Sequence, residues 1–429
     1  MFCLPYAGGG ASAYTGLLRR LTDLIDLTVV PLQLPGRENR IAEPPAFTVA
    51  GIADEIAPAT GEPYALYGHS MGARLAFEVA RELRRRGLRP PSRLYVGGAH
   101  PPDRRVPLAA AVELPDDAFI DQLVRRSGAL PELKHLPELR ELMLPVLRSD
   151  FTWIRNYAYA PEPPLGCPVV AFGGLDDGEV GAAELLGWAR HTAAGFRLRT
   201  LRGGHLFVKD SPGELAALIA ADLTAGHAPP GPDELHLWLG GPDGHEAVLR
   251  RHAGRAVAGA VHAGGLTLVA ATGQDAPRPP GASGEHGPGI GVALLRALGP
   301  GRGGAGAAGG RRGGGAGGGW PAELSDDERE QIEDAAEEDR PWLALHAVAA
   351  KRALLAACGE DADPAAAGFP DLADPGPWRA RCGPGLERLA RWQVVRLPLH
   401  TARGEVLAAV AVPPGRALLS LDMPAVPAA

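Results

Sequence analysis

The sequence has few cysteines and no excess of basic residues. Its four cysteines, Cys3, Cys167, Cys358 and Cys382, stand singly, without the C-x-x-C spacing of a zinc site or the paired pattern of a disulfide framework. We expect free thiols in a reducing cytoplasm, and no bound metal. The net charge of −7 lacks the basic surplus that a nucleic-acid-binding protein needs. Nucleic acid is therefore not an expected partner.

Long hydrophobic runs are also absent. The first residues, MFCLPYAGGG, have neither the basic start nor the long apolar core of a signal peptide. No apolar stretch approaches the ~18 residues that a membrane span requires. We expect a cytoplasmic protein with no membrane partner.

The length of the chain predicts two domains, because 429 residues exceed the ~250–300 at which a single core stops growing. Up to residue 224, short apolar runs alternate with helix-like segments, which is typical of a parallel sheet covered by helices on both faces. The runs expected to be strands are Phe2–Pro5, Leu27–Leu32, Tyr64–Tyr67, Arg93–Gly97, Pro168–Phe172 and Phe196–Leu201.

One segment interrupts this alternation. Residues 99–165 contain helical patterns, among them Asp116–Ser127 and Pro137–Tyr157, and no strand. An insertion after a central strand is expected to form a lid over the strand ends. Its apolar residues Phe151, Trp153 and Ile154 are expected either to line a substrate chamber or to pack inside the lid.

A second domain is predicted after a linker. The Pro- and Gly-rich residues 225–233 form that linker, and the strand-like run ELHLWL opens a domain that spans residues 234–429. Within it, residues 299–319 are almost all glycine, alanine and arginine, which predicts a flexible loop.

The sequence GHSMG, with Ser70 at its centre, follows the predicted strand YALY and precedes an amphipathic helix. This is the context in which G-x-S-x-G forms a nucleophile elbow. The following helix N-terminus presents backbone N–H groups to a developing oxyanion, and Met71 is the expected first donor. The Pro5–Gly10 loop after the first strand is expected to supply the second donor, from Ala7.

A nucleophilic serine needs a base, and the base needs an orienting acid, in the chain order serine, acid, histidine. His205, in GGHLF after a predicted strand, is the expected base. Asp176, just beyond the strand PVVAFGG, is the expected acid. A turn or capping role for Asp176 stays open, because the adjacent Asp177 could serve either purpose.

Five segments together resemble a type II thioesterase of polyketide and nonribosomal peptide pathways: FCLPYAGGGASAY, VPLQLPGREN, GHSMGARLAFEVA, FGGLDD and GGHLF. The resemblance implies an α/β-hydrolase fold over residues 1–224, with Ser70, Asp176 and His205 as a triad and Met71 and Ala7 as the oxyanion hole. It implies hydrolysis of acyl groups from the phosphopantetheine thiol of carrier proteins, through an acyl-serine intermediate and with no cofactor.

Residues 234–429 resemble a 4′-phosphopantetheinyl transferase of α+β fold, through ELHLWL, LSDDEREQI and AAKRALLAACG. The family's metal-binding positions are altered, since Arg352 stands where the family has a ligand glutamate and only Asp275 remains of another motif. The resemblance implies an inactive transferase used for carrier docking or for assembly, with coenzyme A contacts at His262, Lys351 and Arg352. An Ala- and Gly-rich sequence could also produce this pattern by composition alone.

Other functions remain open. The same triad would serve a transacylase or a cyclase, and the second domain could make the chain a bifunctional thioesterase and phosphopantetheinyl transferase. A carrier-protein-binding scaffold without activity is the non-enzymatic alternative, and intact candidate triad residues argue against it.

Overall fold

The chain folds into two compact units. The first comprises the residues up to Glu234 together with the strand Leu418–Met423, and the second begins at Leu235. A computed structural model describes residues 1–127, 131–225, 234–241, 257–263, 266–272, 291–296, 320–357, 363, 366–373, 378–383, 386–401, 404–412 and 418–423. The predicted linker from residue 226 and the Gly-rich segment 299–319 lie outside the described residues.

The sheet of the first unit has the strand order β2-β1-β3-β4-β5-β6-β15. All pairs from β2 to β6 are parallel. The central strands are buried on both faces, as a parallel sheet between helices requires. The bounds are β1 (Phe2–Leu4), β2 (Val30–Pro31), β3 (Ala65–His69), β4 (Arg93–Gly97), β5 (Val169–Gly174) and β6 (Phe196–Leu201).

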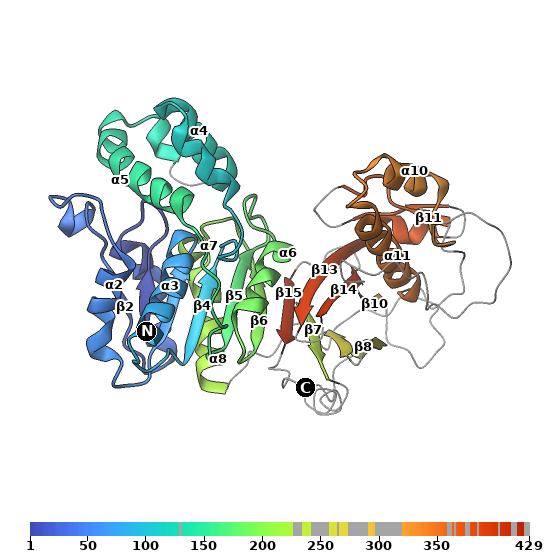
Figure 1. Cartoon of the computed structure of the whole chain (residues 1–429), viewed down its shortest axis with the longest axis horizontal. Helices are drawn as coiled ribbons and strands as arrows, with labels where there is room; N and C mark the ends of the chain where they lie inside the picture. The colour runs from blue at the N-terminus through green and yellow to red at the C-terminus, as the bar shows by residue number, and fades with distance from the viewer. Residues whose placement is uncertain are drawn as a thin grey trace. The chain divides into compact units, whose positions relative to one another are not determined.

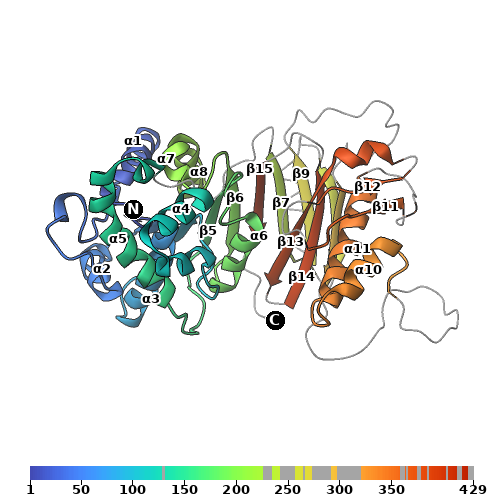
Figure 2. The ribbon, with the colours of Figure 1, turned by 90° about the horizontal axis from the view of Figure 1, so that it is seen from above.

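Helices cover both faces of this sheet (Figure 2). One face carries α1 (Thr15–Leu24) and α8 (Pro212–Ala225), and the other carries α2 (Val49–Ile56) and α3 (Met71–Arg85). Helix α3 buries its apolar face while Arg84 and Arg85 lie in its last turn, where cations favourably meet the helix dipole. Two short helices, α6 (Ala182–Leu185) and α7 (Phe207–Asp210), follow β5 and β6. This is the α/β-hydrolase architecture that the sequence predicted.

The predicted lid helices are present between β4 and β5. They are α4 (Asp116–Ser127) and α5 (Pro137–Asn156), and they lie beyond the carboxyl ends of the central strands (Figure 1). Short 3₁₀ turns connect them, including Pro107–Glu113 and Pro131–Lys134. Among the described residues, no helix is long and apolar enough to cross a membrane.

The end of the chain departs from the predicted domain division. Strand β15 (Leu418–Met423) pairs antiparallel with β6 of the first unit, with Ser420 opposite Arg199. The Arg199 guanidinium donates to Asp422 Oδ1 at 2.8 Å, and Leu419 N donates to Thr200 Oγ1 at 2.6 Å. The assignment of all residues from 234 to 429 to one second domain is therefore wrong for this strand. An open strand edge must find a partner, and that partner can come from any distance along the chain.

The second unit is an α+β structure. Strands β7 (Glu234–Gly240), β9 (Leu266–Thr272) and β8 (Val257–Ala263) pair antiparallel in that order. A second antiparallel sheet has the order β10-β14-β13, with bounds Gly291–Arg296, Gly404–Val412 and Gln393–Thr401. Strands β11 (Ala367–Gly368) and β12 (Arg381–Cys382) are two residues long. The helices of this unit are α10 (Asp326–Asp334) and α11 (Arg340–Ala356).

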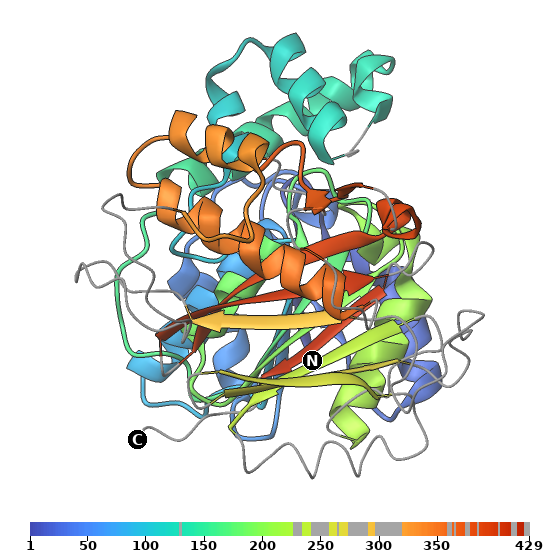
Figure 3. The same cartoon turned by 90° about the vertical axis from the view of Figure 1, so that its right-hand side faces the viewer.

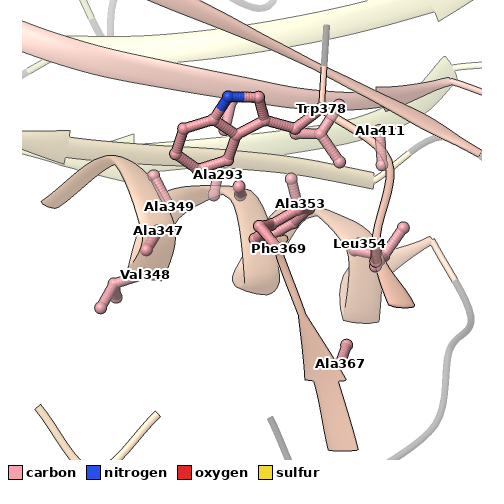
Figure 4. Close-up of a cluster of buried hydrophobic side chains, with 14 of the residues drawn as sticks. Ala293, Ala347, Val348, Ala349, Ala353, Leu354, Ala367, Phe369, Trp378 and Ala411 are labelled. Atoms are coloured by element: carbon pink, nitrogen blue, oxygen red, sulfur yellow. The ribbon is translucent and has the colours of Figure 1, made fainter. Parts of the chain in front are cut away.

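Helix α11 packs across β10 and β14, as the orange helix in front of the red strands shows (Figure 3). Its buried face is rich in alanine, including Ala347, Ala349 and Ala353. These small side chains lie close to Trp378 and Phe369, whose ring centroids are 5.0 Å apart (Figure 4). The large rings fill the space that the alanines leave, which gives this unit its own core.

Candidate active site

Ser70 lies on a sharp turn between β3 and α3. Its φ of +52° is in the left-handed region, which a serine adopts only under constraint from the surrounding structure. A Cβ at Gly68 would overlap the backbone of Gly72, and a Cβ at Gly72 would overlap the Leu4 carbonyl. The two glycines of GHSMG are therefore needed for the close approach of helix, turn and first strand. They allow a turn that holds the Ser70 hydroxyl at the carboxyl end of the sheet.

His205 links Ser70 to a carboxylate. Its Nε2 is 3.1 Å from Ser70 Oγ, and its Nδ1 is 2.9 Å from Asp177 Oδ2. The imidazole is 7% exposed and the carboxylate is fully buried. This is the hydrogen-bonded order that lets a histidine accept the serine proton while a carboxylate orients the ring.

The predicted acid is corrected by this geometry. Asp177, not Asp176, bonds His205, while the Asp176 side chain is exposed at the surface of the same turn. The two residues follow β5 in a loop, where side-chain direction no longer follows the alternation of a strand. Asp177 Oδ1 accepts hydrogen bonds from Glu179 N and Val180 N at 2.8 and 3.0 Å, which orient the carboxylate towards His205.

The Asp177 carboxyl is stabilised in its ionised form. Burial acts to raise its pKa, but the His205 hydrogen bond and charge, together with the two backbone N–H donors, lower the pKa below its ordinary value. An ionised Asp177 is therefore available to stabilise the imidazolium that forms when His205 takes a proton.

His69 is a site residue that the sequence analysis missed. Its Nε2 is 2.7 Å from the His205 carbonyl oxygen, and its Nδ1 is 3.2 Å from the Tyr67 hydroxyl. Burial lowers the pKa of His69 to about 3, with the nearby His205 acting in the same direction, so the ring is neutral and donates from Nε2. This hydrogen bond from His69 holds the backbone of His205 in place. Its place beside Ser70 in GHSMG was the signal available in the sequence.

Met71 and Ala7, the two predicted oxyanion donors, both line the cavity into which Ser70 and His205 open. Met71 is the first residue of α3, where the backbone N–H groups of a helix have no acceptor within the helix. Ala7 lies in the loop after β1. The structure thus brings both residues to the cavity that Ser70 lines.

The lid closes this cavity with apolar side chains. The apolar cavity-lining side chains from the segment between β4 and β5 are Ala99, Val106, Leu108, Leu123, Leu147, Phe151 and Ile154. Trp153 does not line the cavity. Its ring stacks at a tilt against Phe47 and Tyr157, with centroids 5.6 Å away in each case. Of the two roles considered for Trp153, the structure shows packing, because residue 153 lies on the other side of α5 from residues 151 and 154.

Polar side chains also contribute to the cavity wall. His100 and Glu179 line it, with His100 Nε2 3.7 Å from Glu179 Oε1. Arg126 Nε lies 2.9 Å from Glu179 Oε2, so the buried carboxylate has a cationic partner. The walls are otherwise mainly apolar, which suits an acyl chain.

The coenzyme A contacts predicted in the second unit are not brought together as an open site. Lys351 is fully buried, with Nζ 2.6 Å from Glu328 Oε2 and 2.8 Å from the Glu323 carbonyl oxygen. It is unavailable to a phosphate, so this contact was wrongly predicted. Arg352 is 46% exposed and pairs with Glu323 at 2.7 Å.

Two further predictions for the second unit lie outside what the structure describes. His262 lies on β8 opposite Thr267, but its side chain is not among the described ones, and Asp275 is not a described residue. In the described part of the chain, no three His, Cys, Asp or Glu side chains are grouped to hold a metal ion.

Comparison with known proteins covers the first unit. A family model described as "Thioesterase domain" matches residues 1–223. The gramicidin S biosynthesis protein GrsT of Aneurinibacillus migulanus is 37% identical over 53% of this chain and 90% of its own length. Thioesterase PikA5 of Streptomyces venezuelae is 37% identical over 52% of this chain and 80% of its own.

A similar solved structure is the RedJ thioesterase from the prodiginine biosynthetic pathway of Streptomyces coelicolor. It is 38% identical, with a TM-score of 0.47, over 52% of this chain and 84% of that one. Over residues 1–223 the sequence matches the family model, and the hydrolase fold carries a serine, a histidine and an aspartate in hydrogen-bonded order. The chain therefore belongs to the thioesterase family, as a serine hydrolase homologous to type II thioesterases.

Proposed function

We propose that the first unit is an editing thioesterase of a nonribosomal peptide or polyketide pathway. It would remove acyl groups from the phosphopantetheine thiol of carrier proteins. The observation that carries the proposal is the linked geometry of Ser70, His205 and Asp177 at the floor of an apolar, lid-covered cavity. The name of the relative GrsT, which refers to gramicidin S biosynthesis, supports the choice of pathway, and the name of PikA5 supports thioesterase activity.

In this mechanism Ser70 Oγ attacks the thioester carbonyl while His205 Nε2 accepts its proton. The carbonyl oxygen becomes an oxyanion, which the backbone N–H groups of Met71 and Ala7 stabilise. Collapse of the tetrahedral intermediate breaks the carbon–sulfur bond and leaves an acyl-serine. The pantetheine thiolate leaves readily, because a thiol pKa of about 8.5 lies far below that of an alcohol. The thiolate takes the proton from His205, whose neutral Nε2 then deprotonates a water molecule. The water attacks the ester, and the proton returns from His205 to Ser70 Oγ as the free acid leaves.

The decisive experiment uses a panel of carrier proteins loaded with different acyl groups and follows them by intact mass. The wild-type chain should release the acyl group as a free acid, and Ser70→Ala should lose this activity while keeping its thermal unfolding temperature. A fluorophosphonate probe should label the wild type at Ser70 and leave the variant unlabelled. Transfer of the acyl group to an acceptor other than water would favour the transacylase or cyclase alternative. An unlabelled, inactive wild type would overturn the proposal in favour of a scaffold.

For the second unit we propose binding or assembly without phosphopantetheine transfer. Such transfer needs a divalent cation held by carboxylate oxygens. The position equivalent to a ligand glutamate holds Arg352, which cannot lose its charge, and the neighbouring Lys351 is sealed in an ion pair with Glu328. The test is incubation with Mg²⁺, coenzyme A and an apo carrier protein. Mass spectrometry should find the carrier unmodified, and catalytic addition of phosphopantetheine would refute the proposal.

A further inference from the structure

The loop that carries Ala7 is held at three points by residues distant in the sequence. Gly8 N donates to Asp150 Oδ2 at 2.8 Å, and Ala11 N donates to Gln33 Oε1 at 2.8 Å. Between them, the Gly9 carbonyl oxygen accepts from Arg37 Nη1 at 3.1 Å. Three backbone groups of this segment are thus bound by side chains from outside it, so its conformation is set by its neighbours and not by the loop alone.

Two of these neighbours form a buried ion pair. Arg37 donates to both carboxylate oxygens of Asp150, at 2.8 and 2.9 Å, and the two side chains are 3% and 0% exposed. Such a two-pronged guanidinium–carboxylate contact fixes orientation as well as distance. Asp150 belongs to the lid helix α5, whereas Arg37 belongs to the QLPGR segment after β2. The pair therefore joins the lid to the core through the loop that carries Ala7.

The position of Asp150 on α5 ties two parts of the site together. Leu147 and Ile154, one turn before and one turn after it, line the cavity. Gly8 meets Leu147 directly, since a Cβ added at Gly8 would clash with its Cδ2. The hydrogen bond from Gly8 N to Asp150 fixes the peptide plane that follows Ala7. Movement of Asp150 would thus shift both the wall of the cavity and the orientation of Ala7.

We propose that Arg37 and Asp150 are positioning residues for hydrolysis. They hold the Ala7 N–H in line with the developing oxyanion and fix the position of the lid helix relative to the Ala7 loop. The proposal rests on the proposed function, in which Ala7 is an oxyanion donor. A buried ion pair that only supports the fold would affect stability alone. A pair that aligns a donor affects the transition state more than the bound substrate, because the oxyanion forms only there.

The test compares Asp150→Ala, Asp150→Asn and Arg37→Lys in the full chain, with acyl-pantetheine thioesters as substrates. Asp150→Ala should lower kcat by about 10- to 100-fold, somewhat less than removal of an oxyanion donor itself, and change KM by less than about threefold. Affinity for an alkyl boronic acid, which forms a tetrahedral adduct with serine, should fall in parallel with kcat. Affinity for a non-hydrolysable acyl-pantetheine ether should not. Asp150→Asn keeps an oxygen acceptor for Gly8 N, so its loss should be smaller.

Asp222→Asn is the matched control. Asp222 is also a buried aspartate, 4% exposed, that accepts from Tyr95 Oη at 2.8 Å and Arg93 Nε at 3.2 Å. It lies by the start of β4, at the opposite end of the sheet from Ser70. Asp222→Asn should lower the unfolding temperature without lowering kcat.

The outcomes separate the two proposals. If the wild type hydrolyses thioesters and is labelled at Ser70, but the Asp150 variants lose no more kcat than Asp222→Asn, the positioning role is refuted and the proposed function stands. An unchanged boronic acid affinity in the Asp150 variants would refute the positioning role in the same way. If Asp150→Ala does not fold, Asp150→Asn and Arg37→Lys decide the question by the same comparison, which asks whether kcat and the affinity for the boronic acid fall in parallel. An inactive and unlabelled wild type would overturn the proposed function itself.

Discussion

Each unit of this molecule buries a carboxylate against a basic side chain. In the first unit Asp177 and His205 are 2.9 Å apart, with side chains 0% and 7% exposed. In the second unit Glu328 and Lys351 are 2.6 Å apart, and both are fully buried. By distance and burial alone the two pairs are alike, although only the first has the surroundings of an active site.

The difference lies in the remaining partners of each pair. His205 uses its second nitrogen to reach Ser70 Oγ, and both open into a cavity. Glu328 instead accepts hydrogen bonds from the backbone N–H groups of Ser325 and Phe369, while Lys351 donates to a carbonyl oxygen. A buried acid–base pair can take part in catalysis only where one member reaches a reactive group that has access to substrate. Where the remaining hydrogen bonds of the pair go to backbone groups, as they do for Glu328 and Lys351, the pair stabilises the fold.

The largest expected effect is at the carboxylate of the first pair. Asp177→Asn should lower kcat/KM for a small acyl thioester by about 10³- to 10⁴-fold, because the amide cannot stabilise the imidazolium and favours the wrong tautomer. Asp176→Asn, one residue away and exposed, should stay within twofold of the wild type. Steady-state kinetics with both variants settle the identity of the acid. Equal losses, or a greater loss in Asp176→Asn, would contradict the assignment.

The second pair should respond in stability and not in activity. Lys351→Met leaves Glu328 buried without its cation, which should lower the free energy of unfolding of the second unit by about 3–5 kcal/mol. Arg352→Met, which removes an ion pair that is half exposed, should cost less than about 1 kcal/mol. Denaturant unfolding measures both. Thioester hydrolysis by the first unit should be unchanged in either variant, and a loss of hydrolysis would show that the ion pair affects the site.

Both units also contain a buried neutral histidine, which gives them a common response to acid. Burial lowers the pKa of His69 and of His346 to about 3, and the nearby His205 and Arg396, respectively, act in the same direction. Between pH 6.5 and 3 the unfolded chain binds protons at these residues and the folded chain does not, so stability falls as the pH falls. At pH 5 each histidine should cost up to about 2 kcal/mol.

Chemical unfolding at pH 7.5, 6 and 5 measures this slope. His346→Gln should flatten the slope of stability against pH without changing hydrolysis, because His346 lies in the second unit. His69→Gln should flatten it by a similar amount and also reduce kcat, because His69 supports His205. An unchanged slope in both variants would show that other groups dominate the acid response.

The smallest effect is expected where the end of the chain joins the first unit. Asp422→Ala removes a partner of the nearly buried Arg199, which keeps hydrogen bonds to the Leu198 and Leu421 carbonyl oxygens. The expected loss is about 1 kcal/mol in the free energy of unfolding. Asp326→Ala, which removes the exposed partner of Arg329, is the control and should cause no measurable change. Equal effects in the two variants would mean that the Arg199 contact contributes nothing to holding β15.

Much of the first unit was readable from the sequence because its signals are local. A strand followed by GHSMG and an amphipathic helix specifies the turn at Ser70, since only glycine fits the close approaches on either side. The apolar runs predicted the six parallel strands, with shifts of a few residues at their ends, and helical periodicity predicted the two lid helices. Chain order then singled out His205 as the base.

Tertiary structure decided what local pattern could not. Asp176 and Asp177 are neighbours of the same type in a loop, and only the packing around His205 selects the second of them. Trp153 points away from the cavity, and Lys351 is buried, because of the face that each helix turns towards the rest of its unit. Only the packing of the helices in the tertiary structure sets that face. The partners of the pair Arg37–Asp150 are 113 positions apart, and those of the pair Arg199–Asp422, which holds β15, are 223 apart. Such contacts form because an open strand edge and a buried charge each require a partner, wherever along the chain that partner is found.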